Sequence, residues 1–154
     1  MYLQLHTASM TQKTNIQPCA CTTVRKANRA LYRFYEIAMA GTGLSITQFS
    51  ILRSLKRTGP SPLSTLAETL VMERTSLYRT IAPLVEAGAI TLKEGDNKKI
   101  KIADLTPNGI AMIEAARPNW EKAQNAIMAA IGETEWAALS KTLLTIPNLV
   151  SDLK

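Results

Sequence analysis

The stretch Glu73-Arg-Thr-Ser-Leu-Tyr-Arg-Thr-Ile-Ala-Pro-Leu-Val-Glu86, followed by Ala87-Gly88, decides the fold of this chain. Written as a helix, it carries an apolar stripe at helical spacing, formed by Leu77, Ile81, Leu84 and Val85. A second face is polar and basic, formed by Arg74, Thr75, Tyr78 and Arg79. Such a face can reach DNA phosphates and base edges. It can equally be the solvated side of an ordinary core helix, so the flanking sequence has to decide.

A shorter apolar helix is predicted just before this stretch, from Leu63 to Leu70. Val71-Met-Glu73 is a tight connection between the two. Two short helices joined by a few residues predict a helix-turn-helix. In that arrangement the first helix supports the second, whose outer side is free to enter the major groove.

After Gly88 the periodicity changes from helical to alternating, which indicates two short strands over residues 89–93 and 100–104. Gly95-Asp96-Asn97 between them is typical of a turn. The hairpin carries a basic edge made of Lys98, Lys99 and Lys101. A hairpin directly after a recognition helix is a wing, and the two together favour DNA binding more strongly than either alone. In the preceding helix, Pro83 removes one backbone hydrogen bond and predicts a bend or early fraying.

Longer helices are predicted on both sides of this unit. One runs from Cys19 to about Ala40, and a second begins at the capping box Ser45-Ile-Thr-Gln48 and reaches about Thr58. Thr106 and Pro107 have the residue types of an N-cap and first position of another helix. Gly132 separates that helix from a last one, about Thr134 to Leu153. Inside these two helices, kinks are expected at Pro118 and Pro147.

The last helix has apolar residues alternately three and four positions apart: Trp136, Leu139, Leu143, Ile146, Val150 and Leu153. This spacing is typical of a coiled-coil seam and exceeds what one helix needs within its own domain. We therefore expect the two ends of the chain to pair with a second copy. The alternative is that these helices pack on one another within a monomer, as most apolar helical stripes do.

Composition supports a helical, ordered chain with an anionic partner. The 154 residues are 46% hydrophobic, with few aromatics, a net charge of +6 and a pI near 9.5. A basic balance favours nucleic acid over the surface of an anionic membrane. Apolar runs are too short to cross a membrane, and Met1 to His6 do not resemble a secretory signal. Together with only two cysteines, this predicts a cytoplasmic protein with a flexible N-terminal arm over residues 1–18.

No catalytic centre or cofactor site is expected. The single histidine, His6, lies in the arm, where a solvated tail residue is the simplest interpretation. Glycine-rich phosphate loops, HExxH motifs and paired carboxylates are absent from the sequence. The sequence therefore predicts no enzyme.

Cys19-Ala-Cys21 allows three interpretations. Thiols two residues apart point to different sides of a helix, so a disulfide between them would require the helix start to unwind. A helix N-terminus with Arg25 and Lys26 nearby would lower a thiol pKa, as a redox sensor needs. Inert thiols are the simpler interpretation. Metal binding is disfavoured, because two cysteines supply about half of the ligands that a full site needs.

With these residues in place, the chain resembles the MarR family of bacterial winged helix-turn-helix regulators over residues 19–150. The matching segments are Leu44-Ser-Ile-Thr-Gln-Phe49, Leu63-Ser-Thr-Leu-Ala-Glu68, Arg74-Thr-Ser-Leu-Tyr-Arg79, Leu84-Val-Glu-Ala-Gly-Ala-Ile90, Asp96-Asn-Lys98 and Leu105-Thr-Pro-Asn-Gly109. Their order and spacing are specific to the family, although no single segment is. The resemblance implies a mainly α fold, with a winged DNA-binding domain (44–105) and a helical dimerisation region (19–43 and 106–154).

Members of that family are typically homodimers that bind palindromic operators, usually as repressors released by small phenolic ligands or by oxidation. The resemblance implies major-groove readers at Arg74, Thr75, Ser76, Tyr78 and Arg79. The wing differs from the family pattern, because Lys98 stands where an arginine usually enters the minor groove. We therefore expect Lys98 and Lys99 to contact mainly phosphates, with a shallower preference for A·T-rich flanks. Further candidates for phosphate contacts are Arg53, Lys56 and Arg57.

The family also implies an effector pocket between the first helix, the second helix and the helix that begins at Thr106. Arg25 and Arg29 are candidates for holding a small aromatic or anionic effector there, with a solvated face as their alternative. Two other classes of function remain open for the chain. A winged helix can bind protein in place of DNA, and the two cysteines can serve a thiol-based redox protein. Neither alternative explains a basic helix followed by a basic wing as simply as DNA binding does.

Overall fold

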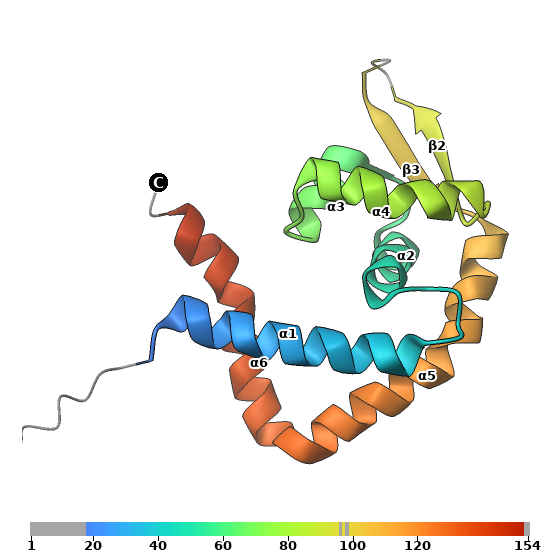
Figure 1. Cartoon of the computed structure of the whole chain (residues 1–154). Coiled ribbons are helices and arrows are strands. Elements are labelled where there is room, and N and C mark those ends of the chain that lie inside the picture. Colours follow the sequence, from blue (N-terminus) through green and yellow to red (C-terminus); the bar gives the residue numbers. More distant parts are fainter. Residues whose placement is uncertain (1–17, 96, 98, 153–154) are drawn as a thin grey trace, which may run out of the picture.

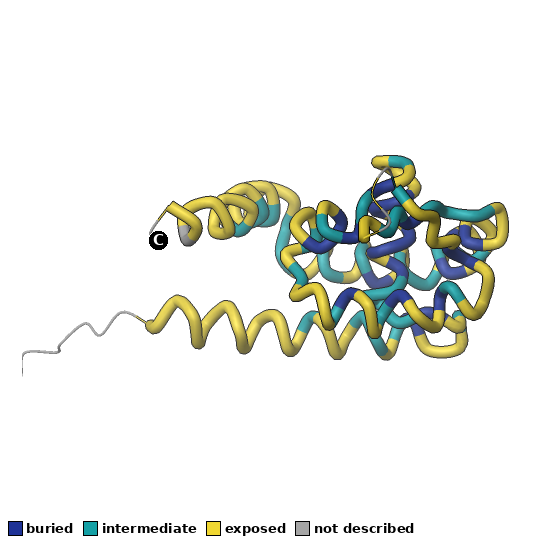
Figure 2. Tube along the Cα trace, turned by 90° about the horizontal axis from the view of Figure 1, so that it is seen from above, coloured by how far each residue is buried: buried dark blue, intermediate teal, exposed yellow. Residues whose placement is uncertain are grey.

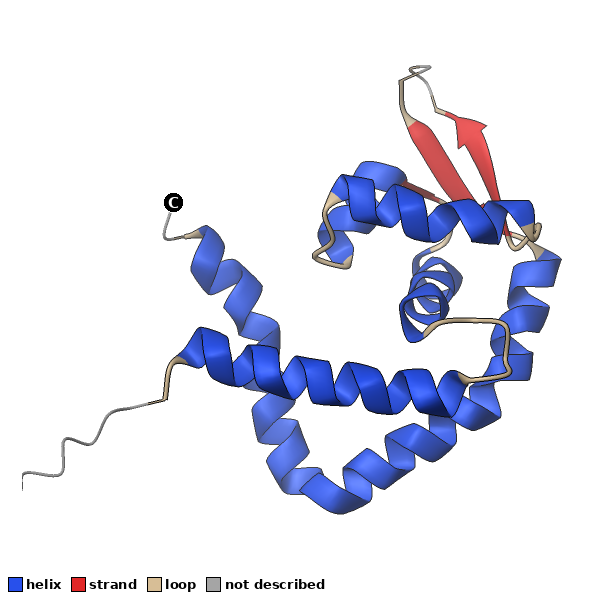
Figure 3. Ribbon diagram, viewed as in Figure 1, coloured by secondary structure: helices blue, strands red, loops and turns tan. Residues whose placement is uncertain are grey.

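The computed structural model describes residues 18–95, 97 and 99–152. Its elements follow in chain order: α1 (Ala20–Met39), α2 (Ile46–Thr58), β1 (Ser61–Pro62), α3 (Leu63–Thr69), α4 (Arg74–Glu86), β2 (Ile90–Glu94), β3 (Lys101–Leu105), α5 (Pro107–Ile131) and α6 (Glu133–Ser151). The mainly α winged helix-turn-helix fold is confirmed. The hairpin of β2 and β3 projects beyond α4, while α1 and α6 extend on the other side of the molecule (Figures 1 and 3). His6 and most of the expected arm lie outside the described residues.

The wing belongs to a three-stranded antiparallel sheet of order β1-β3-β2, so the expected two-stranded hairpin has a third, short partner. In this sheet Ser61 pairs with Ala103 and Pro62 with Ile102. Both hairpin strands begin one residue later than predicted. Ala89 donates its amide to Leu84 O at 2.8 Å and so ends α4, and Ile100 donates to Asn97 O at 2.7 Å within the turn.

The core of the winged helix-turn-helix region gathers the apolar faces of α2, α3 and α4 around the sheet. Leu77, Ile81 and Leu84 of α4 are almost completely buried there. The helix does not fray at Pro83 but continues to Glu86, and the Pro83 carbonyl accepts a hydrogen bond from Ala87 N at 3.0 Å. Only one bond is lost at this proline, and burial of the apolar side outweighs it.

The predicted caps are present and fix the joints between elements. Ser45 and Gln48 form the capping box of α2, with distances of 3.0 and 3.1 Å. Thr106 Oγ1 accepts from Gly109 N at 3.0 Å and donates to Gly88 O at 2.7 Å, which ties the end of β3 to the end of α4. A side chain at Gly109 would collide with the Ala89 carbonyl oxygen, so this joint requires glycine.

The connection between α3 and α4 is as tight as predicted, and it is strained. Val71 donates its amide to Glu68 O at 3.1 Å, and Met72 donates to Ala67 O at 2.8 Å. Val71 has a φ of 52°, a left-handed conformation that β-branched residues rarely adopt. The chain therefore turns sharply between the two helices of the helix-turn-helix.

The terminal helices differ sharply from this core. Met39 is the only fully buried residue of α1. No residue of α6 whose burial is described is fully buried. Figure 2 shows that both helices extend from the body of the protein and are largely exposed. Gly132 separates α5 from α6 as predicted. The axis of α5 changes direction partway along its length in Figure 1. Among the described helices, none is long and apolar enough to cross a membrane.

Candidate nucleic-acid interface and ligand cavities

The predicted reading residues lie on the outer side of α4. Arg74, Thr75, Tyr78 and Arg79 are exposed, whereas Ser76 is half-buried. Tyr78 is 49% exposed, so it is accessible on the outer side of the helix. Because the opposite side of α4 is locked into the core, this exposed set is held on a rigid element.

A groove between α3, α4 and the wing joins residues that are distant in sequence. Its volume is about 190 Å³, and its lining residues are Leu63, Ser64, Arg74, Tyr78, Lys99, Ile100 and Lys101. The structure thus brings together three predicted DNA contacts, Arg74, Tyr78 and Lys99. Their guanidinium, hydroxyl and ammonium groups are all able to donate to phosphate oxygens.

Part of the basic charge on the wing is neutralised by acidic neighbours. Lys101 Nζ lies 3.2 Å from Glu94 Oε1, and Lys93 Nζ lies 2.7 Å from Asp104 Oδ2 on the facing strand. Exposed pairs of this kind contribute little to stability but reduce the local positive potential. The basic edge expected at Lys101 is therefore weaker than its sequence indicates. Lys98 lies outside the described residues.

Two of the three basic residues of α2 that were candidates for phosphate contacts face α5. Lys56 Nζ lies 2.7 Å from Glu114 Oε1 of α5, and Arg117 pairs with the same oxygen. The Arg53 guanidinium lies over the Trp120 ring, 4.1 Å from its centroid. These contacts connect the DNA-binding region to α5. They also hold the pKa of Glu114 below its usual range, chiefly through the hydrogen bond from Lys56.

A cavity of about 330 Å³ lies between α1 and α2. Aromatic and aliphatic groups dominate its lining, which comprises Asn28, Leu31, Tyr32, Tyr35, Ile46, Thr47, Ser50, Ile51, Leu70 and Met72. Tyr35 donates to Gln124 of α5 at 2.6 Å, and burial raises the pKa of its hydroxyl. Arg25 and Arg29 do not line this cavity, since both are exposed on the N-terminal half of α1.

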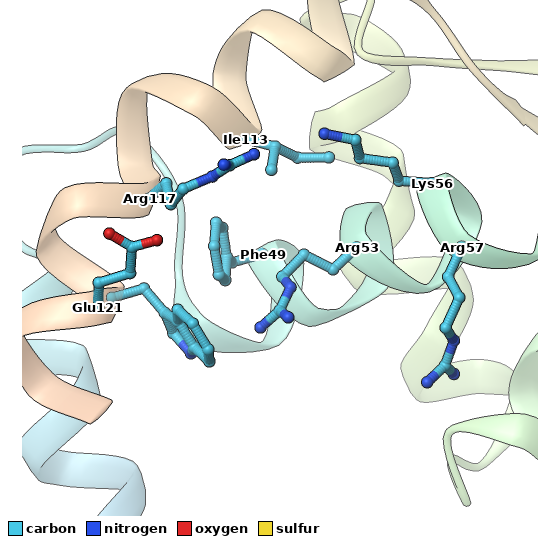
Figure 4. Close-up of a pocket in the computed structure, with 8 residues that line it drawn as sticks. Phe49, Arg53, Lys56, Arg57, Ile113, Arg117 and Glu121 are labelled. Carbon is cyan, nitrogen blue, oxygen red and sulfur yellow. The ribbon is translucent and has the colours of Figure 1, made fainter. Parts of the chain in front are cut away.

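A second cavity, of about 410 Å³, lies on the side of α2 that faces α5 (Figure 4). Its lining residues are Phe49, Arg53, Lys56, Arg57, Ile113, Arg117, Trp120 and Glu121. The family resemblance implied one pocket among α1, α2 and α5, whereas the structure has two separate cavities there. A signal was present, since Arg53 and Arg57 are one helical turn apart on α2, as are Arg117 and Trp120 on α5.

Both cysteines are free and exposed at the start of α1. Cys19 occupies the N-cap position, and the nearby backbone amide and hydroxyl of Thr22 lower the pKa of its thiol. Arg25 Nη2 lies 3.9 Å from Cys21 Sγ, a weak contact. Within the described residues, no three cysteine, histidine, aspartate or glutamate side chains gather into a metal site.

Comparison with known proteins gives a consistent result. Residues 44–101 match the model of the MarR family. The structure of the Mycobacterium tuberculosis transcriptional regulator MosR in complex with DNA is 29% identical, with a TM-score of 0.78 over 88% of this chain and 98% of that one. The sequence has no significant match among curated proteins.

Two other similar structures are of regulators that respond to or bind a known small molecule. Bordetella bronchiseptica BpsR, regulated by 6-hydroxynicotinic acid, is 16% identical with a TM-score of 0.74 over 86% of this chain and 96% of that one. The organohalide-sensing regulator RdhR, bound to 2,4-dichlorophenol, is 21% identical with a TM-score of 0.77 over 100% and 92%. At these identities the two show a shared fold.

Proposed function

Because the chain belongs to the MarR family of transcriptional regulators, we propose that it is a repressor that binds a palindromic operator as a homodimer. The observation that carries this proposal is the exposed basic face of α4 beside the wing. Arg74, Tyr78 and Lys99 line one groove there. Arg79 is exposed on the same helix. In a dimer, each copy places α4 in a major groove, with half-sites about 10 bp apart, centre to centre.

The exposed apolar residues of the terminal helices support a second copy as the partner. Val24, Phe34 and Ile37 of α1 are exposed, and so are Leu139 and Ile146 of the predicted seam on α6. These residues lie on the two helices that the sequence predicts to interlock. A monomeric protein rarely leaves an apolar surface of this extent uncovered.

Selection of bound sequences from random duplexes tests the proposal directly. We expect enrichment of an inverted repeat, and affinity that falls steeply with salt as several phosphates are neutralised. A mass measurement at micromolar concentration should give two copies. Enrichment of no sequence would contradict the proposal and favour a winged helix that binds protein. A single copy bound to DNA would contradict the homodimer.

The α1–α2 cavity is the site we propose for an effector. Its tyrosines and aliphatic groups suit a small aromatic ring. The similarity to BpsR, regulated by 6-hydroxynicotinic acid, and to RdhR, bound to 2,4-dichlorophenol, supports that class of ligand. Arg25 and Arg29 do not line this cavity, so they are not part of the proposed site. The dimer can bind DNA only when the spacing of its two α4 helices fits the duplex. A ligand that binds more tightly to a conformation with a different spacing shifts the dimer to that conformation and so weakens operator binding.

Release by these two compounds can be measured as loss of fluorescence anisotropy from a labelled operator. Tyr32→Ala should weaken the response, because Tyr32 lines the cavity. Arg33→Ala, at the exposed next position on α1, is the matched control. An equal response in both variants would place the effector elsewhere.

Oxidation is a second proposed route of release, supported by the lowered pKa of the exposed Cys19 thiol. A larger thiolate fraction speeds reaction with peroxide. Mild peroxide should weaken operator binding in the native protein and leave a variant with both cysteines changed to serine unaffected. Mass spectrometry of the same samples identifies the oxidised thiol, and unchanged DNA binding would exclude a sensor.

A further inference from the structure

The groove between α3, α4 and the wing combines positive charge with hydroxyl groups. Its cationic residues are Arg74, Lys99 and Lys101, and Ser64 and Tyr78 contribute the hydroxyls. Among the described residues, no acidic side chain lines it. A groove of this composition favours an anionic group with several oxygens that accept hydrogen bonds.

The exposed polar residues of α4 fall on two neighbouring sides of the helix. Arg74 and Tyr78 are four positions apart, so they share one side, and both line the groove. Thr75 and Arg79 are also four positions apart and lie about 100° further around the helix axis. Neither of these two lines the groove. The residues that the family resemblance groups as base readers therefore face two different directions.

The geometry of a DNA duplex indicates what the groove can hold. One sugar–phosphate strand separates each major groove from the minor groove next to it. If α4 enters a major groove, that strand has to pass between α4 and the wing, which projects beyond α4 in Figure 1. The groove lies between the same two elements, in the path of this strand.

We propose that the groove clamps one phosphate of the DNA backbone, and that Arg74 and Tyr78 contact this strand and do not read bases. Base reading is then left to Thr75 and Arg79 on the neighbouring side of α4. Guanidinium, ammonium and hydroxyl groups donate to phosphate oxygens whatever the base sequence. This role of the groove rests on the proposed function, because it requires α4 to enter a major groove.

Glu94 on the wing opposes this clamp. Its Oε1 lies 3.2 Å from Lys101 Nζ, and both side chains remain partly exposed. A phosphate that approaches Lys101 has to compete with the Glu94 carboxylate and is repelled by its charge. Glu94 therefore weakens binding to every duplex alike, in contrast to a residue that reads bases.

Single neutral phosphates in the DNA test the clamp directly. An operator duplex obtained by selection is prepared with one methylphosphonate at a time, and the affinity of the full chain is measured by fluorescence anisotropy. For the native protein, one replacement on the strand between the two grooves should weaken binding by about tenfold, because a charge-assisted contact is lost. For Arg74→Ala the same replacement should cost much less, since that contact is already absent. Additive losses at every phosphate position would overturn the proposal.

Sequence preference separates a clamp from a reader. Arg74→Ala should weaken operator and random duplexes by the same factor, about tenfold, and lower the salt dependence by about one phosphate contact. Arg33→Ala removes the same charge from the exposed face of α1 and should bind as the native protein does. Circular dichroism checks folding, and Tyr78→Phe, which removes only a hydroxyl, gives the same comparison if Arg74→Ala unfolds. A changed preference at any base pair in these groove variants would overturn the proposal.

Glu94→Gln should tighten binding to both kinds of duplex by about threefold and steepen the salt dependence, because Lys101 becomes free for a phosphate. Glu68→Gln, at an exposed position near the other end of α3, removes the same charge outside the groove and is the matched control. Equal gains in the two variants would overturn the opposing role of Glu94. A native protein that selects no sequence would overturn the proposed function and the clamp together, whereas an operator whose preference changes in Arg74→Ala would overturn the clamp alone.

Discussion

The DNA-binding region and the terminal helices are both rich in apolar residues, yet only the first buries them. Phe49, Ile51, Leu52 and Leu77 are at most 1% exposed, whereas Ile37 of α1 is 70% exposed and Leu144 of α6 is 77% exposed. The difference is visible in Figure 2. Helical periodicity thus shows which side of a helix is apolar, but not whether the same chain covers it.

This contrast assigns different tasks to the two regions. The winged domain buries its apolar residues in one core, to which Met39 of α1 and Ile113 and Ala116 of α5 also belong, and can hold the reading side of α4 rigidly. The terminal helices leave apolar surface for a second copy, as proposed above. Stability of the fold and assembly of the dimer should therefore respond to different substitutions.

The largest expected effect is in the core of the winged domain. Leu77→Ala should lower the free energy of unfolding by about 2–5 kcal/mol, because it leaves a cavity beneath α4. Leu144→Ala should change it by less than about 0.5 kcal/mol, since Leu144 is mostly exposed and lies off the predicted seam. Urea unfolding monitored by circular dichroism measures both. Equal losses would remove the distinction between the two regions.

The next effect concerns assembly. Leu139→Glu/Ile146→Glu places charges on the predicted seam of α6 and should weaken the dimer by about 100-fold or more, because the carboxylates lose water in an apolar interface. Asn148→Glu lies on the opposite side of α6 and is the matched control. Sedimentation at a series of concentrations gives the dissociation constants. Association unchanged by the double substitution would leave a monomer as the better description.

Within the interface, the reading helix and the wing should behave differently. Arg79→Ala should cost about 1–3 kcal/mol of operator binding and relax the preference at one base pair. Lys99→Ala should weaken binding to all sequences alike and lower the salt dependence by about one phosphate contact. Competition between specific and random duplexes at several salt concentrations separates the two. An unaltered sequence preference in Arg79→Ala would mean that another residue reads the bases.

The smallest effect is at the joint between α2 and α5. The lowered pKa of Glu114 means that its charged form stabilises the fold above the usual glutamate range, and that this contribution is lost as pH falls through the lowered pKa. Glu114→Gln should therefore be slightly less stable at neutral pH and lose less stability in acid. Urea midpoints between neutral pH and pH ~3 measure this difference. If the urea midpoints of the two proteins change with pH in the same way, the ion pairs of Glu114 contribute no measurable stability.

Local chemistry explains why most elements were predictable. The Ser45–Gln48 capping box and the Thr106 cap depend on residues within one helical turn, and both were confirmed. The one-residue shifts of β2 and β3 arose because hydrogen bonds at the end of α4 and within the turn decide where pairing begins. The third strand was missed because two residues, Ser61 and Pro62, carry no periodicity.

The sequence by itself determined the helices, the turn chemistry and the basic outer face of α4, because these depend on neighbours along the chain. Only the tertiary structure decided which charges are free and where cavities lie. In the sequence, nothing distinguishes Lys56 and Lys101 from the other basic residues. In the folded chain, each pairs with a carboxylate from another element. Among the residues that the structure describes, Arg53 and Arg57 meet no carboxylate, since electrostatic pairing depends on distance in space and not on separation along the chain.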